Sequence, residues 1–260
     1  MVQFFVDAYE LLTKHYMFLL RGVGYTMLIA LIGTVAGLLI GLATGVLRTC
    51  PMSKNGFVRV LQKGLNALIA AYVEVFRGTP MMVQAMVIYW GYAFASGGQT
   101  LPLIPSGILI VSINTGAYMA EIVRGGIISI DKGQFEGAAA VGMTHGQAML
   151  HVILPQVLRN ILPSVANEFV INIKDTSVLN VIGVTELYYF AGIIKRESFQ
   201  TFQTYLVVCA IYFVLTFTVT RLLRLVEKKL QITDSFVICG SQSDPNAEIR
   251  VQKQPEVPND

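Results

Sequence analysis

The sequence predicts an all-helical integral membrane protein with five transmembrane helices, an N-terminus outside the cell and a C-terminus in the cytoplasm. Three observations lead to this prediction. Hydrophobic residues make up 54% of the 260-residue chain, and charged residues make up only 13%, against ~25% in soluble domains. Long stretches without charge separate the charged residues. Basic residues gather in alternate connections, which is the pattern that fixes orientation in a membrane.

This composition also excludes several classes of protein. A mean hydropathy of +0.60 rules out a disordered chain, a coiled coil, a nucleic-acid-binding arm and most soluble enzymes. The three cysteines, Cys50, Cys209 and Cys239, are far apart in the sequence and form no CxxC pair. They suit neither a disulfide framework nor a metal site. We therefore expect neither a metal site nor a nucleic-acid partner.

Residues 1–20 are predicted to form an amphipathic helix at the membrane interface. Aromatic and aliphatic residues recur there near helical spacing, and Asp7 and Glu10 argue against a secretory signal peptide. The alternative is a simple N-terminal extension of the first span. No charged residue falls between Arg21 and Arg48, so residues 22–47 are expected to cross the membrane.

The next apolar region, residues 61–95, is expected to break at 77–80, whose sequence is Arg-Gly-Thr-Pro. The connection before it is basic, with Arg48, Lys54, Arg59 and Lys63, and is therefore cytoplasmic. Two interpretations compete: a hairpin that crosses twice, or one crossing preceded by a short helix in the cytoplasmic half. The single crossing is preferred, because it leaves the next basic residues in the cytoplasm and residues 96–99 outside.

Three further spans complete the predicted domain of residues 21–226. They are expected at 106–123, at 163–184 after Pro163, and at 202–225. Residues 185–200 are expected to form an outside loop, although Lys195 and Arg196 depart from the charge rule. Residues 227–260 are polar and contain three prolines, so we expect a mobile, aperiodic cytoplasmic tail.

The cytoplasmic segment 129–155 carries two helix-start patterns. Asp131 is followed three residues later by Gln134, and Thr144 is followed three residues later by Gln147. Gly142 lies between them, where a left-handed cap is needed, and Pro155 is expected to end the second helix. The alanines 138–140 would offer a smooth face to a partner protein. An amphipathic loop resting on lipid remains an equal alternative on physical grounds alone.

The same segment resembles a known motif. The sequence Glu136-Gly137-Ala138, then Gly142, then Val152-Ile153-Leu154-Pro155 resembles the EAA motif of the membrane subunits of ATP-binding cassette (ABC) importers. Gly137 replaces the usual alanine and Val152 the usual isoleucine. Further stretches resemble the branch that transports polar amino acids such as glutamine, glutamate, arginine, histidine or cystine. These stretches are residues 72–80, 116–121, 133–134 and 174–177. The resemblance covers roughly residues 18–228.

The resemblance implies the type I ABC importer permease architecture and a set of partners. These are an ATPase subunit, an extracytoplasmic amino-acid-binding protein and a second permease subunit, in the lipid of a bacterial plasma membrane. In the family, this loop is the coupling helix that docks on the ATPase. The positions that match are Glu136, Gly137, Ala138, Gly142, Leu154 and Pro155.

The chain is predicted to be a permease rather than an enzyme. It contains no GxxxxGK[S/T] phosphate loop, so ATP and Mg²⁺ would be bound by the partner subunit. No pattern of catalytic residues is present either. The predicted function is ATP-driven uptake of polar amino acids by alternating access. The alternative is a transporter driven by an ion gradient, or a channel.

Ionisable residues inside a membrane are candidates for the substrate path, because placing them there is costly. Broken helices add free backbone N–H and C=O groups at membrane depth. Some of these residues could instead have a purely structural role: Arg77 could reach the membrane interface, and Glu121 could form a surface pair with Arg124. Glu74 could similarly form an intrahelical pair with Arg77. The full set of candidates is Glu74, Arg77, Asn114, Glu121, Lys174, Asp175, Thr176 and Ser177.

Overall fold

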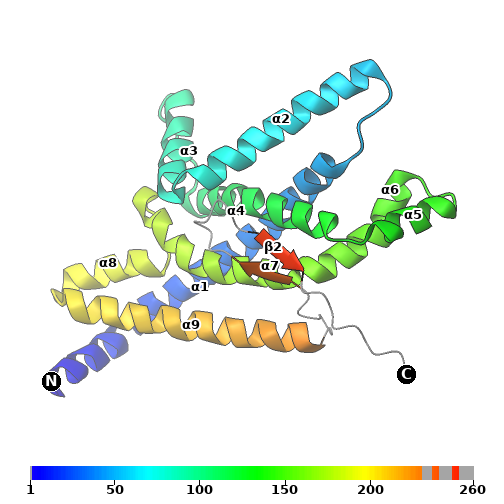
Figure 1. Ribbon diagram of the computed structural model, residues 1–260. Helices are drawn as coiled ribbons and strands as arrows, with labels where there is room; N and C mark the ends of the chain where they lie inside the picture. Colours follow the sequence, from blue (N-terminus) through cyan, green and yellow to red (C-terminus); the bar gives the residue numbers. More distant parts are fainter. Residues whose placement is uncertain (1, 230–235, 240–247, 252–260) are drawn as a thin grey trace, which may run out of the picture.

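A computed structural model describes residues 2–229, 236–239 and 248–251, and side-chain surroundings from residue 6 to residue 229. The described chain is an elongated bundle of helices (Figure 1). The helices, in order, are α1 Val2–Thr49, α2 Gly56–Gly78, α3 Met81–Ala95, α4 Leu103–Ile128, α5 Lys132–Ala140, α6 His145–Ala148, the π-helical segment η1 Met149–Ile153, α7 Leu154–Asp175, the 3₁₀ segment η2 Thr176–Ile182, α8 Leu187–Ser198 and α9 Thr201–Lys229.

The closest helix pair is α1 and α4. Four glycines of α1, four residues apart, form one face of that helix: Gly33, Gly37, Gly41 and Gly45. A Cβ atom on any of them would collide with α4, at Val111, Thr115, Met119 and Val123 respectively. Glycine lets two helix backbones approach closely where lipid provides no hydrophobic force to hold them together. This glycine face therefore sets the distance between α1 and α4.

The first 48 described residues form one helix rather than two separate elements. The helix has a kink at His15, whose backbone angles (φ −112°, ψ 16°) are not helical. The segment predicted to lie at the interface thus runs directly into the first span. The kinked N-terminal end packs against α8 and α9, with Leu11 and Leu19 buried against Leu187 and Val208.

Four helical segments of the described chain are long and apolar enough to cross a membrane. They are residues 6–49, 103–128, 145–182 and 201–229. The apolar helix α3 has only 15 residues and spans about 22 Å at 1.5 Å per residue. It is too short to cross a core of about 30 Å alone. The predicted fifth crossing therefore depends on what α2 adds to α3.

The predicted break between α2 and α3 is confirmed. The first helix ends at Gly78, Thr79 is extended (φ −124°, ψ 148°), and Pro80 caps the second helix. However, α2 has 23 residues and is longer than α3, so the expectation of a short preceding helix was wrong. Beyond α3, Gly97 and Gly98 adopt positive φ angles of 73° and 98° in the turn before α4.

The segment 129–155 contains the predicted helix, turn and helix, with one correction. Asp131 caps α5 by accepting a 2.6 Å hydrogen bond from the Gly133 N–H, and Thr144 forms a reciprocal capping box with Gln147. Gly142 has φ +80° between them. Pro155 does not end the second helix, because α6, η1 and α7 are continuous. Pro155 directly follows the π-helical turn η1, where the regular i→i−4 hydrogen bonds of an α-helix are already interrupted.

Within the expected loop 185–200, residues 187–198 form helix α8, so the expectation of a loop was wrong there. Glu186 begins α8 by accepting hydrogen bonds from the N–H groups of Tyr188 (2.9 Å) and Tyr189 (2.7 Å). It also accepts one from the Tyr212 hydroxyl of α9 at 2.8 Å. Glu186 is fully buried, and this burial raises the pKa of its carboxyl despite those hydrogen bonds. One acidic side chain thus joins the start of α8 to α9.

The tail departs from the all-helical prediction in its described part. Strand β1, Phe236–Cys239, pairs antiparallel with β2, Glu248–Val251, with Phe236 opposite Val251. The expectation of an aperiodic tail is therefore wrong for these residues. The expected mobility of residues 230–235, 240–247 and 252–260 lies outside the described residues.

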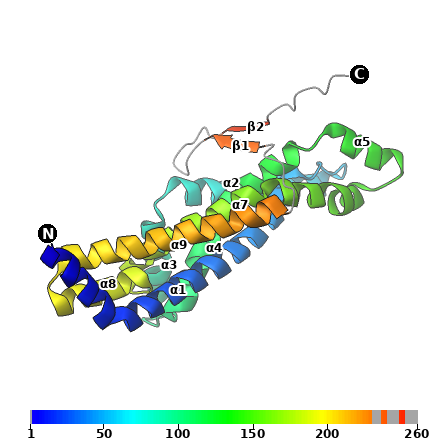
Figure 2. The same ribbon diagram turned by 90° about the horizontal axis from the view of Figure 1, so that it is seen from below.

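The bundle has two distinct ends. The N-terminal end of α1 and α8 lie together at one end, and α5 and α6 project at the other, in both views (Figures 1 and 2). The C-terminal end of α1 and the start of α2 belong to the second end. Four buried clusters of apolar residues hold the helices together between these ends.

Candidate functional site

One buried glutamine, Gln84 of α3, hydrogen-bonds the end of α2 across the break between α2 and α3. The Gln84 side-chain amide donates to the carbonyls of Phe76 and Thr79, both at 2.9 Å. Its oxygen accepts a 2.8 Å hydrogen bond from the amide of Asn114 on α4. The last carbonyls of a helix lack partners within the helix, and Gln84 supplies them here. The predicted path residue Asn114 therefore lies next to the break and fixes Gln84.

Four side chains from three helices gather beside this break, and we call them the break cluster: Arg77, Tyr118, Glu168 and Asp175. The Arg77 guanidinium carbon lies 5.6 Å from the centre of the Tyr118 ring. Tyr118 also interacts electrostatically with Glu168 and Asp175 of α7. Glu168 is buried, with 6% of its surface exposed, and Asp175 is half-buried. The break cluster thus combines one cation, one aromatic ring and two carboxylates.

Arg77 has unused hydrogen-bonding capacity within the described chain. Its Nε is buried and has no hydrogen-bond partner. The Tyr118 ring covers the guanidinium, an arrangement that stabilises a cation without using its N–H donors. An unsatisfied buried donor costs about 1–3 kcal/mol. The arrangement therefore leaves a donor available to an anionic group that enters the cluster.

A second polar group crosses the bundle nearby. Asn172 of α7 donates to the Thr34 hydroxyl of α1 at 2.8 Å and accepts from the Thr115 hydroxyl of α4 at 3.1 Å. All three residues are buried. The three side chains, from three helices, are therefore hydrogen-bonded to one another. They position α7 just before the end of that helix at Asp175.

The remaining candidates near the break differ in exposure. Glu74 is exposed on α2 and forms no ion pair with Arg77, although both residues lie in the described range. Lys174 is exposed and Ser177 half-buried. The buried Thr176 donates its hydroxyl to the carbonyl of Ile173 at 3.0 Å, where α7 becomes a 3₁₀ helix.

Glu121 lies on α4, three residues after Tyr118 of the break cluster. Its carboxylate forms an ion pair with Arg48 at the end of α1 and a second with Arg124 at 2.8 Å. The structure therefore places this carboxylate in a shared contact between α1 and α4. Neither of the two arginines that pair with Glu121 belongs to the break cluster.

The residues matched to the coupling motif are mostly on the surface. Glu136, Gly137, Gly142 and Pro155 are exposed, and Leu154 is half-buried. Ala138 is buried, with 6% exposed. Ala138 is therefore part of the inner face of α5, and of the three alanines 138–140 only the last two are exposed.

The family of the chain follows from comparison with known proteins. Residues 37–232 match the family described as the inner-membrane component of binding-protein-dependent transport systems. The chain belongs to this family. Its members are permease subunits, so the prediction of an ABC importer permease that is not itself the ATPase is confirmed, together with its place in the membrane.

Curated relatives align with more than four fifths of this chain. The glutamine transport system permease protein GlnP of Escherichia coli K12 is 35% identical over 214 residues, which is 82% of this chain and 93% of that protein. A putative glutamine transport system permease protein from Rickettsia bellii is 31% identical over 217 residues, covering 84% and 94%.

Solved structures share the fold. An amino acid ABC transporter crystallised with histidines is 35% identical, with a TM-score of 0.71 and coverage of 84% of this chain and 96% of that one. The MetNI methionine ABC transporter in an inward-facing conformation gives a TM-score of 0.62 at 18% identity, covering 85% and 98%. The second likeness concerns the fold alone. Both support the type I permease architecture.

Proposed function

We propose that this permease subunit imports polar amino acids, driven by a separate ATPase and supplied by an extracytoplasmic binding protein. The break cluster is the observation that carries the choice of substrate. A zwitterionic amino acid needs a cation for its carboxylate and an anion for its ammonium group, and the cluster provides both. The relatives named for glutamine and amino-acid transport support the same class of substrate.

Each group of the break cluster has a role in this proposal. The Arg77 guanidinium, with its free Nε donor, binds the substrate carboxylate through charge-assisted hydrogen bonds. Glu168 and Asp175 bind the ammonium group from α7. Tyr118 positions Arg77 by covering one side of the guanidinium. Glu74, Lys174, Thr176 and Ser177 line the approach to this site.

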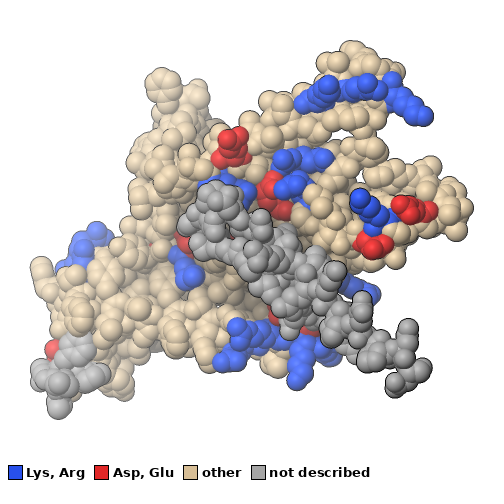
Figure 3. All heavy atoms as spheres, in the orientation of Figure 1, with Lys and Arg blue, Asp and Glu red and all other residues tan. Residues whose placement is uncertain are grey.

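The proposed orientation puts the basic end of the bundle in the cytoplasm. Figure 3 shows Lys and Arg side chains over the first part of α2 and around the end of α9. Arg48 and Lys132 belong to the same end, and positive residues favour the cytoplasmic side. The N-terminus is then outside. The five crossings are α1, α3 together with the end of α2, α4, α7 with η2, and α9.

The proposed assembly pairs this chain with a second permease subunit, itself or a similar one. The exposed segment α5–α6 docks on the ATPase through Glu136, Gly137, Gly142 and Pro155. ATP binding by the ATPases moves these segments and changes the relative stability of the inward-open and outward-open states. ATP and Mg²⁺ remain on the partner.

Uptake by the complete transporter tests the function. The permease, ATPase and binding protein are reconstituted in liposomes, and uptake of radiolabelled glutamine, glutamate, arginine, histidine and cystine is measured with internal ATP. We expect ATP-dependent uptake of at least one of them. Uptake that persists without the ATPase would instead support an ion-gradient mechanism, and absence of uptake for all of them would refute the proposal.

A matched pair of variants tests the site. Arg77→Gln removes the proposed carboxylate ligand, and Lys63→Gln removes an exposed positive charge from the same helix. A lost charge-assisted hydrogen bond costs about 1.5–3 kcal/mol, so the substrate concentration for half-maximal uptake should rise roughly tenfold or more in Arg77→Gln only. Equal effects in both variants would remove Arg77 from the site. Glu74→Gln should change which amino acids are transported while assembly stays normal.

A further inference from the structure

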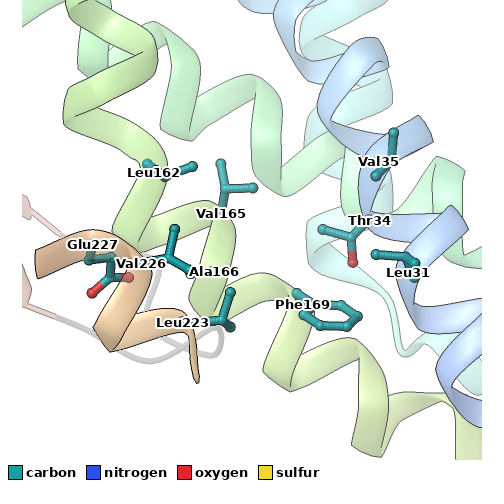
Figure 4. Close-up of a pocket in the computed structure, with 10 residues that line it drawn as sticks. All are labelled: Leu31, Thr34, Val35, Leu162, Val165, Ala166, Phe169, Leu223, Val226 and Glu227. Atoms are coloured by element: carbon teal, nitrogen blue, oxygen red, sulfur yellow. The ribbon is translucent and has the colours of Figure 1, made fainter. Parts of the chain in front are cut away.

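A groove with a volume of about 190 Å³ runs between α1, α7 and α9 (Figure 4). Its walls are formed by Leu31 and Val35 of α1, Val165 and Phe169 of α7, and Leu223 and Val226 of α9. Leu31, Val35 and Val226 each expose about half of their surface, at 53%, 52% and 51%. Within the described residues, the groove therefore opens on the outside of the bundle rather than into its core.

Among the described residues that line the interior of this groove, none offers a free hydrogen-bonding group to a ligand. Its only hydroxyl, on Thr34, donates to the Ala30 carbonyl at 2.7 Å and accepts from Asn172. The one charged residue among those that line it is Glu227, near the end of α9. Apolar cavities of this order of size exclude water and take up apolar molecules. The groove thus suits a hydrocarbon chain.

Around the end of the groove near Glu227, positively charged residues outnumber this one carboxylate. Arg224 and Lys228 are neighbours of the lining residues Leu223 and Glu227 on α9, and both are exposed. Arg159 is exposed on α7, one turn before the lining residue Leu162. Three exposed cations therefore lie within one helical turn, along α7 or α9, of residues that line this end of the groove. In the proposed orientation this end meets the headgroups of the cytoplasmic leaflet.

We propose that this groove binds one acyl chain of an anionic phospholipid from the cytoplasmic leaflet, with Arg159, Arg224 and Lys228 holding its phosphate. The net positive charge favours a phosphate with no compensating ammonium group. A second copy of the chain is a poorer occupant, because it would bring two sets of these cations together. The proposal rests on the proposed orientation, but binding of lipid is measured without transport.

Native mass spectrometry of the purified transporter complex tests the site. Dioleoyl phosphatidylglycerol is titrated into the delipidated complex, with dioleoyl phosphatidylcholine and phosphatidylethanolamine as comparisons. Two variants fill the groove: Ala166→Phe from the buried side and Val226→Trp from the half-exposed rim. Val214→Phe, at an exposed position of α9 outside the groove, is the control.

We expect tight binding of phosphatidylglycerol by the native chain and by Val214→Phe. Each groove-filling variant should bind it roughly tenfold more weakly, because several methylene groups lose their contact. Arg224→Gln and Lys228→Gln should each weaken phosphatidylglycerol binding about fivefold and leave phosphatidylcholine unchanged. Unchanged binding in Val226→Trp would overturn the site. Equal binding of all three lipids would overturn the role of the cations. If a Val226→Cys variant forms a disulfide between two copies of the chain, the groove is occupied by a second subunit and the lipid proposal is wrong.

Discussion

The glycine face of α1 makes a quantitative prediction about stability, which Gly41→Ala tests. A Cβ atom at Gly41 would lie 2.7 Å from the backbone carbonyl carbon of Met119 and 2.9 Å from the backbone nitrogen of Ala120. Neither backbone atom can move aside as a flexible side chain could. The two helices must therefore separate. Gly24→Ala is the matched control, because Gly24 lies in the same helix, is exposed and has nothing within 4 Å of the added methyl group.

The size of the effect follows from two opposing terms. Alanine is more favourable than glycine inside a helix by about 0.5–1 kcal/mol, and both variants gain this amount. Overpacking a close contact costs about 1–3 kcal/mol, and only Gly41→Ala bears this cost. The helix term cancels between the two variants. Gly41→Ala should therefore be less stable than Gly24→Ala by about 1–3 kcal/mol.

Unfolding of the purified permease in mixed micelles measures this difference. SDS is titrated into each variant, and the loss of helix is followed by circular dichroism. Gly24→Ala should unfold at a higher SDS fraction than the native chain, and Gly41→Ala at a lower one. If Gly41→Ala proves as stable as Gly24→Ala, close contact along this face does not determine the packing of α1 on α4.

Other features lead to three further predictions. Gly142→Pro should retain ATP hydrolysis by the complex but lose uptake, because proline cannot adopt the φ of +80° found at Gly142. The control Gly146→Ala should retain both activities. Uptake and hydrolysis are measured together in liposomes. In intact cells without native cysteines, a membrane-impermeant maleimide should label a cysteine at Gly98 and not at Gly146, and the reverse would invert the proposed orientation. Glu186→Ala should lower the free energy of unfolding by about 2–4 kcal/mol, through loss of the helix cap and an unpaired Tyr212 hydroxyl. The control Glu197→Ala, at an exposed position of the same helix, should lower the free energy of unfolding by less than ~1 kcal/mol. Both variants are measured in the same SDS titration.

Local signals in the sequence predicted the features that depend on neighbouring residues. The break after Gly78 follows from the extended conformation that Pro80 imposes on Thr79. The capping box of Thr144 and the positive φ of Gly142 are likewise properties of a few adjacent residues. Such features form wherever the chain places them, so no knowledge of distant contacts is needed.

Features that depend on distant contacts were missed or wrong. Pro155 was expected to stop a helix, but the π-helical turn before it lets α6 continue into α7. Residues 185–200 were expected to be a loop, but a buried Glu186 and the packing of α8 on α9 make residues 187–198 helical. Gln84 and Tyr118 act at the candidate site only because other helices bring Asn114 and Arg77 to them.

The glycines of α1 were visible in the sequence as residues four apart, but their partner was not. Glycine at this spacing indicates a close helix contact in a membrane. Only the fold identifies α4, whose residues Val111 to Val123 repeat at the same spacing, as the opposing surface. Similarly, the sequence suggested a pair between Glu121 and Arg124 as an alternative to the substrate path, but it could not show that Arg48 of α1 also pairs with Glu121.

The unbroken helical segment from His145 to Ile182 has a mechanical consequence. Its 38 residues join the end that carries the docking segment to the helix end at Asp175. At 1.5 Å per residue, the stretch from His145 to Asp175 forms a lever about 45 Å long. If α5 and α6 dock on the ATPase as proposed, a tilt imposed there is transmitted along this helical segment to the break cluster. The π-helical turn η1 and Pro163 are the two features of this segment at which helices commonly bend. Bending at either one would change how much of a tilt reaches the break cluster.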